Sequence, residues 1–158
     1  MGKKNTSSDQ PKNKVREPDI IEIKVPGKSE YVGVVRLVMV SIANRMAFTN
    51  ENTEDIKIAV GEACINVIKH AYHKDFIDKE IIVRCLIYPN KLTIIIKDKG
   101  VGFSPLFVQQ YVKRSYVSKD KKVGLGIFLI KSLMDEVEYD KNLPTGTQVR
   151  MIKYTTPS

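Results

Sequence analysis

The chain has 158 residues, 42% of them hydrophobic, which is enough for one sizeable core but too little for two ordinary domains. The net charge of +8 would favour polyanions, but part of it lies in residues 1–18, where a polar, basic composition predicts a disordered tail. No stretch reaches the roughly 18 apolar residues that span a bilayer, and the N-terminus lacks the apolar core of a signal peptide. We therefore expect one cytoplasmic domain, residues 19–158, that binds no membrane and does not bind nucleic acid directly.

The first predicted elements are a strand and two amphipathic helices. Residues 21–25 alternate apolar and polar side chains, which is typical of a half-buried strand, and Pro26 ends it. Apolar residues recur at three- and four-residue steps over residues 31–46 and predict a first core helix. The polar segment 49–53 supplies N-cap residues, and a second apolar stripe over residues 56–71 predicts another helix.

The second half of the chain is richer in strands. Residues 80–88 and 91–97 are rich in β-branched side chains and predict a hairpin. A third core helix is expected after Gly124, and residues 137–139 and 147–154 predict two closing strands. The apolar positions that suggest this third helix are Leu125, Phe128, Leu129, Leu133 and Met134. This order predicts an α+β fold, a two-layer sandwich whose mixed, mostly antiparallel sheet carries helices on one face.

The two cysteines lie in different predicted elements. Cys64 belongs to the second helical pattern and Cys85 to a strand pattern, and neither is part of a CxxC motif or a Cys/His cluster. A disulfide or a zinc site is therefore not expected. We expect two buried free thiols, since free cysteine packs as a small hydrophobic residue.

Glu62 and Asn66 are the candidate polar centre of a functional site. A spacing of four residues places both on one face of the second predicted helix. Asn is a poor residue for a helix interior, so its presence there calls for a reason. An amide oxygen can hold a hard cation and a carboxylate can accept a proton. Together the pair indicates a site where a nucleotide and a metal ion could meet.

Two glycine motifs strengthen the nucleotide hypothesis. Asp98 follows a predicted strand and can accept a hydrogen bond from an exocyclic amine, while Gly100 and Gly102 let backbone approach a ligand closely. Gly124 and Gly126 open the third predicted helix, where free N–H groups favour an anion. Each motif alone is weak because turns favour Asp and Gly anyway, so their order and spacing carry the information.

Other segments complete this hypothesis. Residues 103–123 form a long connection without a clear period, typical of a functional lid or a disordered loop, and we favour the lid. Thr147 is either an ordinary strand residue or a hydroxyl that reaches the base. The Walker and Rossmann phosphate motifs are absent from the sequence, so the nucleotide must be held in another way.

These residues together resemble the GHKL superfamily, which includes gyrase, MutL, histidine kinases and anti-sigma kinases. Residues 62–72 resemble its N box, residues 98–102 its G1 box, residues 124–126 its G2 box, and Gly146-Thr147 its last nucleotide-binding box. The similarity runs from about Ile20 to Tyr154.

One branch of the superfamily is more similar still. Residues 30–37, 56–64 and 133–137 resemble the RsbW-type anti-sigma factors and serine-protein kinases. Histidine kinases often carry His just before the N-box glutamate, whereas this chain has Gly61. Membership of the GHKL superfamily, which the resemblance suggests, implies the GHKL, or Bergerat, ATP-binding fold, with ATP and Mg²⁺ as the bound groups.

The resemblance also implies a role for each candidate residue. Glu62 would be the general base or water-orienting carboxylate, and Asn66 would bind Mg²⁺ and the nucleotide. The remaining roles concern the nucleotide: Asp98 would read adenine, Gly100 and Gly102 would shape the pocket, Gly124 and Gly126 would present amides to the phosphates, and Thr147 would support the base. Residues 103–123 would be the ATP lid.

The implied function is that of an anti-sigma factor and ATP-dependent serine kinase. Such a protein binds a sigma factor and phosphorylates a STAS-domain anti-anti-sigma partner on serine, as a homodimer. Its first helix, with Arg36, is a candidate binding surface, although a plain core helix with one exposed Arg fits almost as well.

Three alternatives remain open. The first is a sibling switch kinase that phosphorylates a STAS regulator without binding a sigma factor. The second is a non-catalytic, ATP-gated partner-binding module, against which the retention of Glu62 and Asn66 argues. The third is a nucleic-acid binder, which rests on charge alone.

Overall fold

The computed structural model describes residues 16–71, 79–99, 125–140 and 146–155. The predicted lid over residues 103–123, and the predicted tail up to residue 15, lie outside this part of the chain. Within the described residues, the helices are too short or too polar to cross a lipid bilayer.

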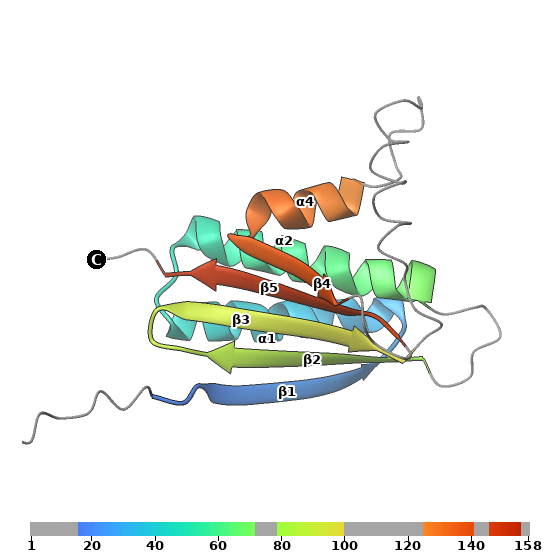
Figure 1. Cartoon of the computed structure of the whole chain (residues 1–158), viewed down its shortest axis with the longest axis horizontal. Helices are drawn as coiled ribbons and strands as arrows, with labels where there is room; N and C mark the ends of the chain where they lie inside the picture. The colour runs from blue at the N-terminus through green and yellow to red at the C-terminus, as the bar shows by residue number, and fades with distance from the viewer. Residues whose placement is uncertain (1–15, 72–78, 100–124, 141–145, 156–158) are drawn as a thin grey trace, which may run out of the picture.

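Five strands form one sheet in the order β1-β2-β3-β5-β4 (Figure 1). Their bounds are Asp19–Pro26 for β1, Glu80–Ile87 for β2, Lys91–Asp98 for β3, Glu136–Asp140 for β4 and Gln148–Tyr154 for β5. All five predicted strands are therefore confirmed. The sheet was expected to be mostly antiparallel, and every neighbouring pair among these strands is antiparallel.

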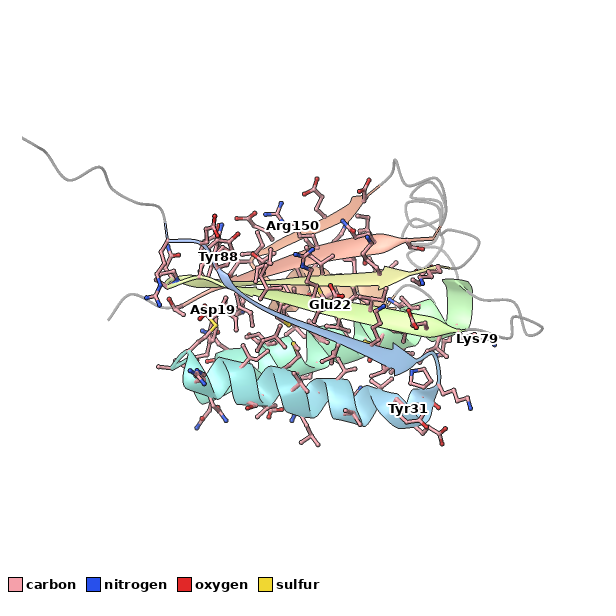
Figure 2. All side chains as sticks on the ribbon, turned by 90° about the horizontal axis from the view of Figure 1, so that it is seen from below. Asp19, Glu22, Tyr31, Lys79, Tyr88 and Arg150 are labelled. Carbon is pink, nitrogen blue, oxygen red and sulfur yellow. The ribbon has the colours of Figure 1, made fainter. Side chains whose placement is uncertain are left out.

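The α-helices of the described residues lie on one side of this sheet (Figure 1). They are α1 (Val32–Arg45), preceded by a 3-10 turn at Ser29–Tyr31, α2 (Asn50–Asn66) and α4 (Leu125–Leu133). Figure 2 shows the helices on one side of the sheet, whereas the Arg150 side chain projects from the other side. The predicted two-layer α+β sandwich is thus confirmed, and α2 packs against both α1 and α4.

Helix α2 has a defined start and an unusual end. Thr49 caps it: the backbone N–H of Asn52 donates a hydrogen bond of 3.1 Å to the Thr49 hydroxyl oxygen. After Asn66 the chain continues as a π-helical turn at Val67–Ala71. Such turns widen a helix locally and often occur at functional sites, and this one directly follows a candidate site residue.

The core lies between the sheet and the helices. One row of side chains across the sheet follows the strand register from Ile23 through Val83, Ile96 and Val149 to Tyr139. The three middle residues of this row are buried, and Ile56 of α2 is also fully buried. Alternation along each strand sends these residues to the helix-covered face, which is the pattern that the sequence predicts.

The face that α4 turns to the core differs from the expectation. Ile127 and Ile130 are buried, as is Met134 just after the helix, whereas Leu125 and Phe128 are 52% and 58% exposed. The two polar side chains of this short helix, Lys131 and Ser132, both lie near its end, so residues 125–130 carry no polar residue that would show which side points inward.

Both cysteines are free and buried, as predicted. Burial raises the pKa of the Cys64 thiol to about 12, an effect that the nearby Arg36 charge opposes, and burial also raises the pKa of Cys85 to about 12. The Cys85 thiol packs with its Sγ 3.8 Å from the Sδ of Met39. Because only the thiolate is a good nucleophile, both side chains are inert core residues at neutral pH.

The buried Lys153 side chain connects β5, α2 and α4 through hydrogen bonds. Lys153 of β5 is 7% exposed, and its Nζ donates a hydrogen bond of 3.0 Å to Oδ2 of Asp55 on α2. The same Nζ donates a second hydrogen bond of 2.6 Å to the backbone carbonyl of Leu133, at the end of α4. This cation therefore satisfies a carbonyl at a helix C-terminus and pairs with a carboxylate of the neighbouring helix.

Replacing Lys153 with Met should lower the free energy of unfolding by about 2 kcal/mol, because the Asp55 carboxylate and the Leu133 carbonyl both lose their partner. Urea unfolding followed by circular dichroism measures this loss. The matched control is Lys57→Met, which breaks the more exposed Lys57–Glu54 pair and should cost under about 0.5 kcal/mol. Equal losses for the two variants would contradict the role given to Lys153.

Candidate nucleotide-binding site

A pocket opens between α2, α4 and one end of the sheet. It is open to solvent, and about 400 Å³ of space not filled by atoms lies in it and at its mouth. Its polar lining comes from three of the predicted residues and its apolar lining from both layers of the fold. The lining residues are Asn66, Asp98, Thr147, Ala63, Val67, Ile127, Tyr139 and Val149.

Asp98 and Thr147 close the sheet end of this pocket together. The backbone N–H of Asp98 donates a hydrogen bond of 3.1 Å to the Thr147 carbonyl. In return, the backbone N–H of Thr147 donates one of 3.2 Å to Oδ1 of Asp98. The Asp98 side chain, only 4% exposed, is therefore held in a fixed orientation where β3 ends.

Gly146 makes this arrangement possible. Its φ of 78° lies in the left-handed region that favours glycine, and a Cβ on it would collide with the backbone carbonyl oxygen of Asp98. A side chain at this position would push Thr147 away from Asp98. This close approach explains why residue 146, in the last predicted box, is a glycine.

The Thr147 hydroxyl is a candidate ligand contact. Its Oγ1 is buried and has no hydrogen-bond partner among the described residues. Buried polar atoms are nearly always hydrogen-bonded, so an orphan hydroxyl in a pocket wall suits a polar ligand atom. Together with the Asp98 carboxylate it provides the mixed donor and acceptor set that a nucleobase edge requires.

Glu62 and Asn66 meet the first turn of α4 on the other side of the pocket. A Cβ built on Gly126 would lie 3.0 Å from Oε2 of Glu62 and 3.2 Å from Oδ1 of Asn66. The two side chains therefore share one face of α2, as their spacing predicts, and both approach the glycine. A carboxylate, an amide oxygen and a helix N-terminus thus gather within a few ångströms, and this donor set suits a hard cation and phosphate oxygens.

Part of the predicted site lies outside the described residues. The residues concerned are Gly100, Gly102, Gly124 and the lid. Their roles stay predictions. The structure therefore brings together Glu62 and Asn66 with Gly126, and Asp98 with Thr147.

The apolar walls are what the sequence analysis missed. Tyr139 of β4 pairs with Val149 of β5, and both lie in the row of side chains that faces the helices. Burial raises the pKa of the Tyr139 hydroxyl to about 12, so it stays protonated at neutral pH. Strand alternation could have assigned both residues to this face, but their place beside Asp98 follows only from the β3-β5-β4 order.

Known proteins share the sequence pattern and the fold of this chain. The model of the histidine kinase-like ATPase domain matches residues 25–153. The serine-protein kinase RsbW of Bacillus pumilus (strain SAFR-032) is 44% identical over 141 residues, covering 86% of each chain. RsbW of Bacillus subtilis (strain 168) is 39% identical over 140 residues, again covering 86% of each chain.

Solved structures show the same fold. The RsbU and RsbW domains of a Mycobacterium tuberculosis protein match with a TM-score of 0.63 at 15% identity, covering 89% of this chain and 34% of that longer one. The histidine kinase domain of a blue-light activated kinase from Erythrobacter litoralis matches with a TM-score of 0.50 at 19% identity, covering 87% of this chain and 64% of the other.

The predicted family is thereby confirmed, and with it the expected ATP-binding fold. A domain of this kind is an ATPase domain, which implies that the chain binds ATP. The chain belongs to the family of histidine kinase-like ATPase domains and, within it, to the RsbW serine-protein kinases.

Proposed function

We propose that this protein transfers the γ-phosphate of ATP to a serine of a STAS-domain anti-anti-sigma protein, and that it also binds and sequesters a sigma factor. The relatives that share about two fifths of its residues are serine-protein kinases. The observation that carries the proposal is the convergence of Glu62 and Asn66 on Gly126, beside the pocket that Asp98 lines. This gathers a proton acceptor, a hard-cation ligand and a base-reading carboxylate in one site.

The sheet end of the pocket would bind adenine. The Asp98 carboxylate would accept a hydrogen bond from the exocyclic amine of the base, and guanine, which carries a carbonyl there, would be rejected. The Thr147 hydroxyl supports this assignment, since it has no hydrogen-bond partner among the described residues and can bond to a ligand atom. Tyr139 and Val149 offer apolar surface to the ring. Gly100 and Gly102 would shape the same pocket.

The phosphates would lie towards α4. At the start of this helix, the backbone N–H groups near Gly124 and Gly126 would bind phosphate oxygens, which the helix dipole favours. The Asn66 side-chain oxygen is a suitable ligand for Mg²⁺, a hard cation that neutralises phosphate charge when it is bound.

Glu62 would act as the general base. The serine oxygen bonds to the γ-phosphorus while the bond to the β-phosphate oxygen breaks, and ADP leaves with that oxygen. The serine proton passes to the Glu62 carboxylate, or Glu62 orients the attacking hydroxyl. Little covalent chemistry is asked of the protein, because phosphoryl transfer depends mainly on positioning and charge neutralisation.

The outer face of α1 is the proposed surface for the sigma factor. Val34 and Leu37 are 50% and 72% exposed there, and exposed apolar side chains in one place mark interaction surfaces. Formation of a homodimer belongs to the same proposal.

The central experiment incubates the protein with labelled ATP, Mg²⁺ and a candidate STAS-domain protein. Phosphoserine on that partner is the expected result, because the site holds the groups that phosphoryl transfer needs. In parallel, a tagged form of the protein should co-purify with a sigma factor. Transfer without a bound sigma factor would favour the sibling switch kinase, whereas ATP binding without transfer would favour the non-catalytic module.

Glu62→Ala should reduce phosphate transfer at least about a hundredfold, because a general base contributes roughly 10² to 10⁴ to such rates. ATP affinity, measured by calorimetry, should change little. The control is Glu51→Ala, at an exposed carboxylate in the first turn of the same helix, which should leave transfer unchanged. Transfer by Glu62→Ala at the normal rate would rule out its role as the base.

Asp98→Asn should weaken ATP binding about tenfold or more, because a hydrogen bond to a charged acceptor is worth about 1.5–3 kcal/mol. The preference for ATP over GTP should fall as well, since the acceptor that rejects guanine is weakened. Competition with a fluorescent nucleotide measures both. Asp19→Asn, at the opposite end of the sheet in β1, serves as the control. Unchanged affinity of Asp98→Asn would mean that the base binds elsewhere.

A further inference from the structure

Arg36 of α1 occupies the space that a side chain at position 61 of α2 would fill. A Cβ built on Gly61 would lie 2.8 Å from Cζ of Arg36, and closer still to two of its guanidinium nitrogens. The Arg36 side chain is thus half-buried against α2, and it is not the exposed arginine of a plain core helix. A planar guanidinium fits well over a stretch of helix without a side chain.

The contact of Arg36 with Gly61 is one of packing. Among the described residues, Arg36 takes part in none of the salt bridges. The positive charge of Arg36 also acts on Cys64 in the core. Burial raises the pKa of the Cys64 thiol to about 12, and the Arg36 charge opposes this rise. Cys64 lies three residues after Gly61, on the same flank of α2, so the guanidinium lies along the flank that faces α1.

The residue next to Gly61 is the proposed base. Consecutive residues of an α-helix point about 100° apart, so Gly61 can face α1 while Glu62 reaches the other neighbouring helix. The Glu62 carboxylate is the group that approaches Gly126 of α4. Any rotation or shift of α2 about its axis moves both contacts at once, and closely packed interiors transmit such shifts.

We propose that Arg36 is a positioning residue: its guanidinium, seated on Gly61, fixes the rotation of α2 and thereby the place of Glu62 at the nucleotide site. This inference rests on the proposed function, because it concerns the base of that reaction. Glu62 touches the reacting groups, whereas Arg36 acts through the backbone of α2.

Gly61→Ala is the sharpest test, because it displaces the guanidinium without removing it. The atoms in its way are the end of a flexible side chain, and alanine is the better helix former by about 1 kcal/mol. The variant should therefore be as stable as the original or more so. It should nevertheless transfer phosphate about tenfold more slowly, since small misplacements of a catalytic group are costly. The KM for ATP should stay within about twofold.

Arg36→Ala, which removes the guanidinium, should show a similar loss. The double variant Arg36→Ala/Gly61→Ala should be no slower than Arg36→Ala alone, because the added methyl then has nothing to displace. Gly33→Ala is the matched control: it is also a glycine of a helix, but nothing lies within 4 Å of its added Cβ. It should gain stability without a change in transfer rate.

These variants separate the two proposals. The inference is overturned if Gly61→Ala transfers phosphate at the original rate, if the losses of the two single variants multiply in the double variant, or if KM for ATP rises in step with the loss. Should Arg36→Ala fail to fold, Gly61→Ala measured against Gly33→Ala still decides. If the unchanged protein transfers no phosphate to a STAS-domain partner, the proposed function itself fails, and this inference fails with it.

Discussion

Helix α2 is packed between its two neighbours at points where a side chain is missing. On one flank the Arg36 guanidinium of α1 fills the space over Gly61, and on the other Gly126 of α4 lies against Glu62 and Asn66. Because a Cβ would collide with Arg36 at Gly61 and would be tightly packed at Gly126, both contacts limit how α2 can rotate over the sheet. The direction of its two polar side chains, and with it the geometry of the whole site, depends on this double constraint.

The sheet supplies the second wall and holds the helices against it. Asp98 and Thr147 exchange backbone and side-chain hydrogen bonds across β3 and β5, so the carboxylate cannot turn away from the pocket. Further along β5, Lys153 binds both α2 and the end of α4. The same strand therefore orients a binding residue at one end and anchors the two site helices at the other, which couples the stability of the fold to the geometry of the site.

Much of this could be predicted from the sequence, since the relevant rules are local. Alternation indicated the first strand and β-branched residues indicated the hairpin of β2 and β3. Helical spacing placed Glu62 beside Asn66, and the position of Asp98 after a predicted strand placed it at a strand end. The rest depends on contacts between distant segments. The predicted inward face of α4 was wrong at Leu125 and Phe128, because residues 125–130 are all apolar and none of them marks the outer side. Tyr139 joins the pocket only through the register of β4 with β5. The packing of Arg36 against Gly61 depends on how α1 and α2 cross, which no short-range sequence pattern encodes.

The hydrogen-bonded pair of Asp98 and Thr147 also bears on how the protein is made. Its members are 49 residues apart, and Thr147 directly precedes the strand that fills the gap between β3 and β4. During translation, a nascent chain that still lacks this segment can pair β1, β2 and β3, but it has only half of a nucleotide pocket. The pocket therefore becomes complete only after residues 146–154 have been made, so a fragment that ends before Gly146 has one of its two walls incomplete.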